Sequence, residues 1–219
     1  MSEIKRRKPL RVVALISGRG SNLQALLAHP QHRQSYEIVA VVSNKPSAPG
    51  LDLARSHGVQ TQSLQHTGFP SRELFDEALV KTIDAHAPDL VVLAGFMRIL
   101  SDGFVAHYAQ RLMNIHPSLL PSFAGLNTHQ RAIEAGCQLH GATVHFVTAE
   151  LDHGPIVAQA AVEIAPDDTP DTLAARVLQR EHEILPACVL AFAHGQLQLD
   201  GLRVLWHGKR PPVFTSKEA

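Results

Sequence analysis

The segment 114–121 carries the residues best suited to acid–base chemistry. Asn114 and His116 stand two apart at the end of an apolar run, so in a strand their side chains share one face. An amide that donates a hydrogen bond, beside an imidazole that passes a proton, suits acyl chemistry. A single histidine is more often structural, but the paired asparagine and the prolines that flank the next loop, Pro117 and Pro121, favour a function.

A second candidate site is the glycine-rich stretch 17–22, which lies between an apolar run and a helical pattern. Glycines let the backbone approach an anion, and the N–H groups at a helix start bind phosphate. Leu23 replaces the third glycine of the dinucleotide motif GxGxxG, and the next apolar run ends in Ser43 and Asn44 rather than in an acid. The stretch therefore favours one terminal phosphate; a tight turn capped by Ser21 is the alternative.

A third candidate is the acidic loop 150–155, which joins two apolar runs and contains Gly154 and Pro155. Its carboxylate Asp152 could orient and charge a histidine, because a nearby carboxylate favours the protonated imidazole. It could also be a turn residue only. The sequence by itself does not place Asp152 near His116.

Other catalytic patterns fail on inspection. The chain has 14 histidines without convincing metal-ligand spacing: His182 begins an HExxH pattern in which Pro186 replaces the second histidine, and His140 and His145 would face opposite sides of one strand. There is no GxSxG nucleophile elbow. Cys137 lacks an evident base and reads as a helix-end residue. We therefore expect no metal.

Short apolar runs alternate with helical patterns along the chain. Strands are predicted at 11–16, 37–42, 59–63, 90–94, 112–115, 142–147, 156–164 and 197–204, and helices at 22–28, 51–57, 72–86, 128–135 and 169–194. Ser71 is expected to cap the third helix, and Pro186 to bend or divide the last one. Runs that are apolar on both faces predict a single-domain α/β fold, with a mostly parallel twisted sheet and helices on both faces. Mixed strands are expected toward the C-terminal part, where 142–147 and 156–164 could pair antiparallel.

Composition and charge narrow the function classes. Of 219 residues, 20 are Lys or Arg and 20 are Asp or Glu, and this zero net charge argues against a nucleic-acid partner. The basic run 5–8 reads as a solvated tail. The apolar runs fall well short of the ~20 residues of a membrane span, and the start lacks a signal-peptide core. Cys137 and Cys188 lie far apart, as expected in a reducing compartment, so the sequence predicts a cytoplasmic protein.

The three constellations, in this order, resemble the phosphoribosylglycinamide formyltransferase family, which is folate-dependent. The resemblance spans about residues 12–201 and rests on ISGRGSNLQALL, VVSNKPSAPGL, PDLVVLAGFMRILS, NIHPSLLPSFAGLNTH, HGATVHFVTAELDHGPI and ARVLQREHEILP. HPSLLP is shared with other 10-formyltetrahydrofolate enzymes, whereas SGxGSNL with SNK is more specific. The resemblance implies a Rossmann-like formyltransferase domain at 10–205, with a phosphate-binding part at about 10–100 and a folate-binding and catalytic part at about 90–200. A flexible basic tail at 1–9 and a C-terminal tail at 206–219 complete the expected organisation.

The resemblance also implies residue roles. Asn114, His116 and Asp152 match the family's catalytic trio. The phosphate of glycinamide ribonucleotide (GAR) would be held by Gly20, Ser21 and Asn22, and its ribose by Glu181. The folate site would be lined by Asn114, Arg72, Met97, Arg98, Ile99 and Leu100, and closed around the pterin by the loop of Thr148, Ala149, Glu150, Leu151 and Asp152.

The implied reaction is direct formyl transfer from the co-substrate 10-formyltetrahydrofolate to the GAR amine in purine synthesis, without a metal. Asn114 and protonated His116 would stabilise the tetrahedral oxyanion, and Asp152 would favour the protonated imidazole. The expected partners are these small molecules, with no nucleic acid and no membrane, and the chain is expected to be a monomer or weak homodimer.

Three rival functions differ in the additional domains and site residues that they require. A methionyl-tRNA formyltransferase adds a C-terminal RNA-contacting domain, for which there is no room after about residue 205. A formyl-folate hydrolase usually adds an N-terminal regulatory domain, whereas here the first strand is expected near Arg11. A nucleotide-binding module without catalysis would keep the glycine loop but would not need Asn114, His116 and Asp152 in one cleft.

Overall fold

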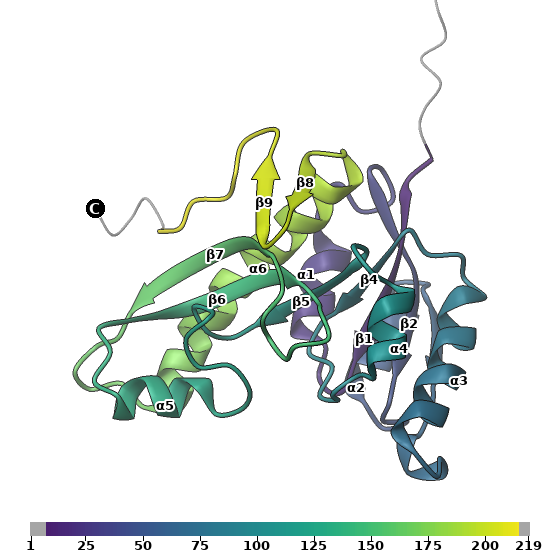
Figure 1. Ribbon diagram of the computed structural model, residues 1–219, viewed down its shortest axis with the longest axis horizontal. Coiled ribbons are helices and arrows are strands. Elements are labelled where there is room, and N and C mark those ends of the chain that lie inside the picture. Colours follow the sequence, from purple (N-terminus) through teal and green to yellow (C-terminus); the bar gives the residue numbers. More distant parts are fainter. Residues whose placement is uncertain (1–7, 215–219) are drawn as a thin grey trace, which may run out of the picture.

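A nine-stranded sheet forms the centre of the computed structural model, which describes residues 8–214 (Figure 1). The strand order is β3-β2-β1-β4-β5-β6-β7-β9-β8. The strands are β1 Leu10–Ile16, β2 Tyr36–Ser43, β3 Gln60–Ser63, β4 Leu90–Leu93, β5 Leu112–His116, β6 Leu139–Phe146, β7 Ile156–Glu163, β8 Leu197–Asp200 and β9 Arg203–Trp206. The helices are α1 Ser21–Ala28, α2 Pro49–Ser56, α3 Arg72–Asp84, α4 Asp102–His107, α5 Thr128–Glu134 and α6 Pro170–Ala193, with a short 3₁₀ turn η1 at His66–Gly68.

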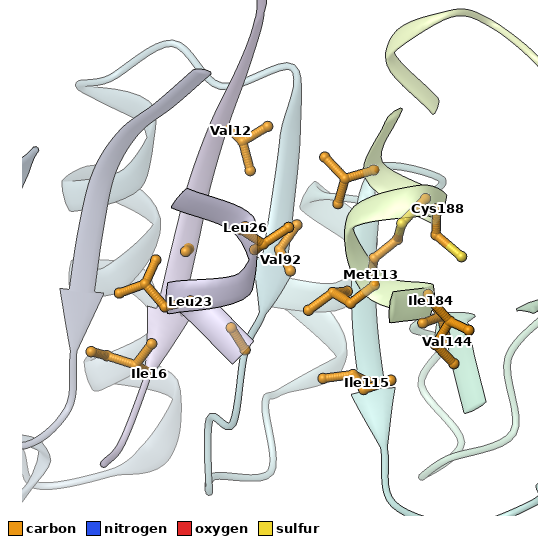
Figure 2. Close-up of a cluster of buried hydrophobic side chains, with 14 of the residues drawn as sticks. Val12, Ile16, Leu23, Leu26, Val92, Met113, Ile115, Val144, Ile184 and Cys188 are labelled. Carbon is orange, nitrogen blue, oxygen red and sulfur yellow. The ribbon is translucent and has the colours of Figure 1, made fainter. Parts of the chain in front are cut away.

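The first half of the sheet is parallel, and its central strands β1 and β4 are buried on both faces. Strands β1 to β5 pair in parallel, and every residue of β4 is buried. Helices α1, α2 and α6 cover one face, where Leu23 and Leu26 of α1 and Ile184 of α6 belong to one buried cluster with Val12 and Val144 of the strands, and Ile184 lies beside Val144 (Figure 2). Helices α3 and α4 cover the other face. The predicted α/β class with helices on both faces is confirmed.

The second half of the sheet is mixed. Strand β6 pairs antiparallel with both β5 and β7, as expected for 142–147 and 156–164. The single strand predicted at 197–204 is wrong: the chain turns at Gly201, whose φ is 60°, and forms the antiparallel hairpin of β8 and β9. Helix α4 was not predicted; its six residues are too few for a clear 3.6-residue pattern, although Ser101 caps it by accepting from the amide of Phe104.

Helix α6 remains one element despite Pro186. Thr169 and Thr172 form a capping box at its start, and Pro170 occupies the first turn, where no N–H is needed. Pro186 lies inside the helix and is buried, and the helix continues through it to Ala193, so the predicted division does not occur. Ser71 caps α3 as predicted, by accepting from the amide of Leu74.

The described part of the predicted C-terminal tail, residues 207–214, packs on the domain. The amide of Ala161 in β7 donates to the carbonyl of Val213 at 2.8 Å, and Arg180 of α6 donates to the carbonyl of Pro212 at 3.1 Å. These bonds hold the segment beside β7, whose ladder with β9 is limited to one residue pair. Most of the predicted N-terminal tail lies outside the described residues. None of the helices within 8–214 has the length and apolar character needed to cross a membrane.

A glycine in β6 provides a test of the packing between β6 and β7. A Cβ at Gly141 would lie 2.0 Å from the carbonyl oxygen of Ala160, so Gly141→Ala must displace backbone. We expect the free energy of unfolding to fall by about 1–3 kcal/mol. The control Gly103→Ala, where a Cβ meets nothing within 4 Å, should be neutral or stabilising. Urea unfolding measures both; equal stability of the two variants would contradict the packing.

Candidate active site

Two side chains at the end of β5 point to one side of the sheet, as their spacing predicts. Asn114 lies opposite His145 in the antiparallel ladder, and His116 lies opposite Thr143. The buried hydroxyl of Thr143 accepts from the amide of Leu120 and donates to the carbonyl of Ser118. Strand β6 therefore fixes both the β5 residues and the proline-flanked loop that follows them.

His116 is buried between two oxygen acceptors. Its Nε2 lies 3.1 Å from the carbonyl oxygen of Phe123, and its Nδ1 lies 3.5 Å from Oδ2 of Asp152. Only 8% of the His116 side chain is exposed. A neutral imidazole has one N–H and can donate to only one of these oxygens. The doubly protonated ring donates to both, so the surroundings of His116 suit a group that carries and releases a proton.

Asp152 reaches His116 from the loop between β6 and β7. Its backbone has a φ of 53°, a left-handed conformation that is uncommon for a residue other than glycine. Its Oδ2 also accepts from the amide of Gly125 at 2.9 Å, and its side chain is 8% exposed. The carboxylate thus joins two loops that the sequence separates, and the proximity of Asp152 to His116, which the sequence left open, is present.

His145 is a further member of the cluster that sequence reasoning missed. Its Nδ1 lies 3.0 Å from the carbonyl of Phe146, so Nδ1 is the donor and Nε2 is free to accept. Nε2 lies 3.1 Å from the amide nitrogen of Asn114 and 3.9 Å from Oδ1 of Asp152. Burial lowers the pKa of His145, which keeps the ring neutral. The signal that would have found it is the β5–β6 register, which the sequence does not reveal.

A buried histidine, His140, packs against the partly buried His129 close to His116. The rings of His140 and His129 meet edge to face with centroids 5.1 Å apart, and Phe123 packs on His140 at 6.1 Å. His140 is 1% exposed. Burial, reinforced by His129, lowers the pKa of His140 to about 4.

The glycine-rich stretch forms the predicted turn and helix start. Gly20 has a φ of 80° and precedes α1 as its N-cap, and no side chain caps the helix, so the alternative of a Ser21 cap is not what forms. A Cβ at Gly20 would lie 3.0 Å from Cα of Gly50 in α2, so the close approach of two backbones also requires glycine. The first turn of α1 is left with amide donors that suit an anion.

Asn22 and Glu181 meet although they belong to α1 and α6. The Asn22 amide donates to Oε2 of Glu181 at 2.6 Å, and both side chains are buried. Burial raises the pKa of Glu181, and the hydrogen bond from Asn22 opposes this shift. Oδ1 of Asn22 is buried without a partner, so this pair retains hydrogen-bonding capacity. Glu181, which was expected to contact the same substrate as Asn22, therefore lies beside the glycine-rich stretch.

The residues expected to line a folate site fall into three segments. Met97 and Ile99 are exposed after β4, Leu100 is buried, and the Arg98 guanidinium stacks on the Phe75 ring at 4.6 Å. The segment Thr148, Ala149, Glu150 and Leu151 leads into Asp152 and exposes Leu151 beside the His116 cluster.

Arg72 forms the third segment, at the start of α3. It pairs with Glu73 at 3.4 Å and borders a groove of about 720 Å³ between α3 and α4. No contact joins Arg72 to Asn114, His116 or Asp152 among the described residues. Over residues 8–214, no group of three or more His, Cys, Asp or Glu side chains is arranged to hold a metal ion.

Comparison with known proteins gives the class of the fold and site. A family model described as formyl transferase matches residues 10–189. The chain also matches formyltetrahydrofolate deformylase from Burkholderia mallei, with a TM-score of 0.82 at 30% identity, over 91% of this chain and 70% of that one. Fold and site are thus those of a formyl transferase domain.

Two more similar proteins narrow this class. Phosphoribosylglycinamide formyltransferase of Escherichia coli K12 is 49% identical over 204 residues, which cover 93% of this chain and 96% of that protein. The structure of the Coxiella burnetii phosphoribosylglycinamide formyltransferase with CHES matches with a TM-score of 0.87 at 49% identity, over 92% of this chain and 95% of that one. The chain belongs to the phosphoribosylglycinamide formyltransferase family.

The buried His140, with His129 beside it, predicts a loss of stability in acid. Above about pH 6.5 His140 is neutral whether folded or unfolded; below it, the unfolded chain binds a proton that the folded chain takes up only near pH 4. His140 alone should therefore lower the free energy of unfolding by about 2 kcal/mol between pH 7.5 and pH 5. Urea unfolding of His140→Phe should show a smaller loss than the wild type or the exposed control His57→Gln. An unchanged loss in His140→Phe would contradict the assignment.

Proposed function

We propose that this chain transfers the formyl group of 10-formyltetrahydrofolate to the amine of GAR. Asn114, His116 and Asp152 stabilise the tetrahedral intermediate of this transfer. The products are formyl-GAR and tetrahydrofolate, in purine biosynthesis. The observation that carries the proposal is the buried pairing of His116 with Asp152 beside the half-buried Asn114. This cluster lies at the end of β5. The neighbouring strand is β4, and the loop after β4 carries the expected folate segment.

The reaction needs an oxyanion stabiliser and a proton donor. The GAR amine attacks the formyl carbon, a C–N bond forms, and the carbonyl oxygen takes the negative charge. Asn114 donates one amide hydrogen to His145 and has a second for the oxyanion. The bond from carbon to N10 of the folate then breaks, and N10 receives a proton as it leaves. His116, whose Nδ1 faces Asp152, donates this proton, and the imidazole regains a proton from the attacking amine.

Asp152 acts on His116 by charge. A carboxylate 3.5 Å from Nδ1 stabilises the imidazolium, and the amide of Gly125 keeps that carboxylate in place. The neutral His145 accepts from Asn114, so the amide nitrogen rather than the amide oxygen of Asn114 is held in this orientation. Each polar group of the cluster thus has a partner that fixes its role.

Substrate contacts are assigned to the segments already described. Gly20, Ser21 and Asn22 hold the GAR phosphate at the start of α1, and Glu181 binds the ribose beside Asn22. The folate lies along Asn114, Arg72, Met97, Arg98, Ile99, Leu100, Thr148, Ala149, Glu150, Leu151 and Asp152. The exposed Met97, Ile99 and Leu151 offer apolar surface to a flat ring system.

The remaining features of the proposal concern the whole chain. It acts in the cytoplasm on small molecules, without a nucleic-acid or membrane partner and without a metal, as a monomer or weak homodimer. The phosphate-binding part comprises about residues 10–100, and the folate-binding and catalytic part about 90–200.

Substitution of the trio tests the chemistry. Asn114→Ala, His116→Ala and Asp152→Ala should each remain folded and lose about 10²–10³ in kcat, because each removes a group that stabilises the oxyanion or its proton donor. The assay follows tetrahydrofolate release from 10-formyltetrahydrofolate in the presence of GAR, with thermal melting as the folding control. A folded His116→Ala enzyme with near-normal turnover would refute the assignment.

Substitution of His145 separates positioning from chemistry. His145→Phe keeps the ring volume but offers Asn114 no acceptor, so kcat should fall by about 10- to 100-fold. His145→Gln supplies a side-chain oxygen that can accept and should retain more activity than His145→Phe. Both are measured in the same assay; equal activity of the two variants would contradict a positioning role through Asn114.

A further inference from the structure

The hydroxyl of Ser17 lies where three loops of the parallel half meet. Ser17 directly follows β1 and is 5% exposed. Its hydroxyl donates to Oδ1 of Asn44 at 2.6 Å and accepts from the main-chain N–H of Met97 at 2.8 Å. Its own amide donates to the carbonyl of Gly95 at 3.0 Å. One serine thus joins the loops that follow β1, β2 and β4.

The groups around the Ser17 hydroxyl fix the direction of its two hydrogen bonds. Asn44 is 3% exposed, and its side-chain oxygen takes the single proton of the Ser17 hydroxyl. A lone pair of the hydroxyl oxygen is then left for the N–H of Met97. Without that oxygen, this partly buried N–H loses its acceptor, which favours another path for the Met97 backbone.

The loops that Ser17 joins serve different substrates under the proposed function, on which this inference rests. Ser17 begins the loop that ends in the phosphate-binding Gly20 and the start of α1. Met97 begins the folate segment after β4. The two loops flank the boundary between β1 and β4, where the strand order of the sheet reverses.

We propose that Ser17 is a positioning residue that couples the two substrate sites. Its hydroxyl fixes the Met97 backbone relative to the phosphate loop, so GAR that orders the phosphate loop also orders the folate segment. Ser43 is the matched control: it is equally buried at the end of β2, but its hydroxyl donates to the carbonyl of Lys45 in its own loop.

The test measures binding of tetrahydrofolate by calorimetry, with and without saturating GAR, since product and acceptor together cannot react. In the wild type, GAR should tighten tetrahydrofolate binding. Ser17→Ala should weaken tetrahydrofolate binding in the presence of GAR by about tenfold. In this variant GAR should have almost no effect on the affinity for tetrahydrofolate. Ser43→Ala should match the wild type in both.

Amide hydrogen exchange provides the direct structural readout. The Met97 amide should exchange faster in Ser17→Ala than in the wild type or in Ser43→Ala. The inference would be overturned if GAR tightened tetrahydrofolate binding in Ser17→Ala as much as in the wild type, or had no effect in the wild type. It would also be overturned if Ser17→Ala and Ser43→Ala lost the same amount of coupling. A wild type that binds neither GAR nor tetrahydrofolate would instead contradict the proposed function, and the inference with it.

Discussion

The buried pairing of His116 with Asp152 is the constraint on which the arrangement of the loops around the end of β5 depends. Burying a carboxylate is costly unless hydrogen bonds compensate it, and here Oδ2 accepts from the amide of Gly125 and faces Nδ1 of His116. The same pairing requires Asp152 to adopt a left-handed backbone and turns the loop between β6 and β7 toward β5. The other ring nitrogen of His116 binds the carbonyl of Phe123, so two loops converge on one imidazole.

The two halves of the sheet contribute different things to the site. The parallel half supplies loops at the carboxyl ends of its strands, where α/β proteins place ligands. The antiparallel strand β6 supplies His145 and Thr143, which hold Asn114 and the loop after His116. Helix α6 packs against both halves and carries Glu181 to Asn22 at the start of α1. The position of Glu181 therefore depends on the packing of the whole domain.

The sequence predicted what depends on local periodicity. Apolar runs located the parallel strands, and the two-residue spacing put Asn114 and His116 on one face. It could not place Asp152 beside His116, because that contact depends on how a long loop folds. It missed His145, because its partner is set by the register between β5 and β6. It also joined β8 and β9 into one strand, although Asp200 and Gly201 between two alternating apolar runs are a hairpin signal that was not used.

The central claim is that Asp152 acts through His116, and a double-mutant cycle in kcat tests it most directly. The turnover of His116→Ala, Asp152→Ala and the double variant is compared with that of the wild type in the formyl-transfer assay. If the carboxylate acts only by charging and orienting the imidazole, the double variant should be no slower than the slower single variant, because groups that act as a unit are not additive. Losses that multiply in the double variant would show two independent roles and contradict the account.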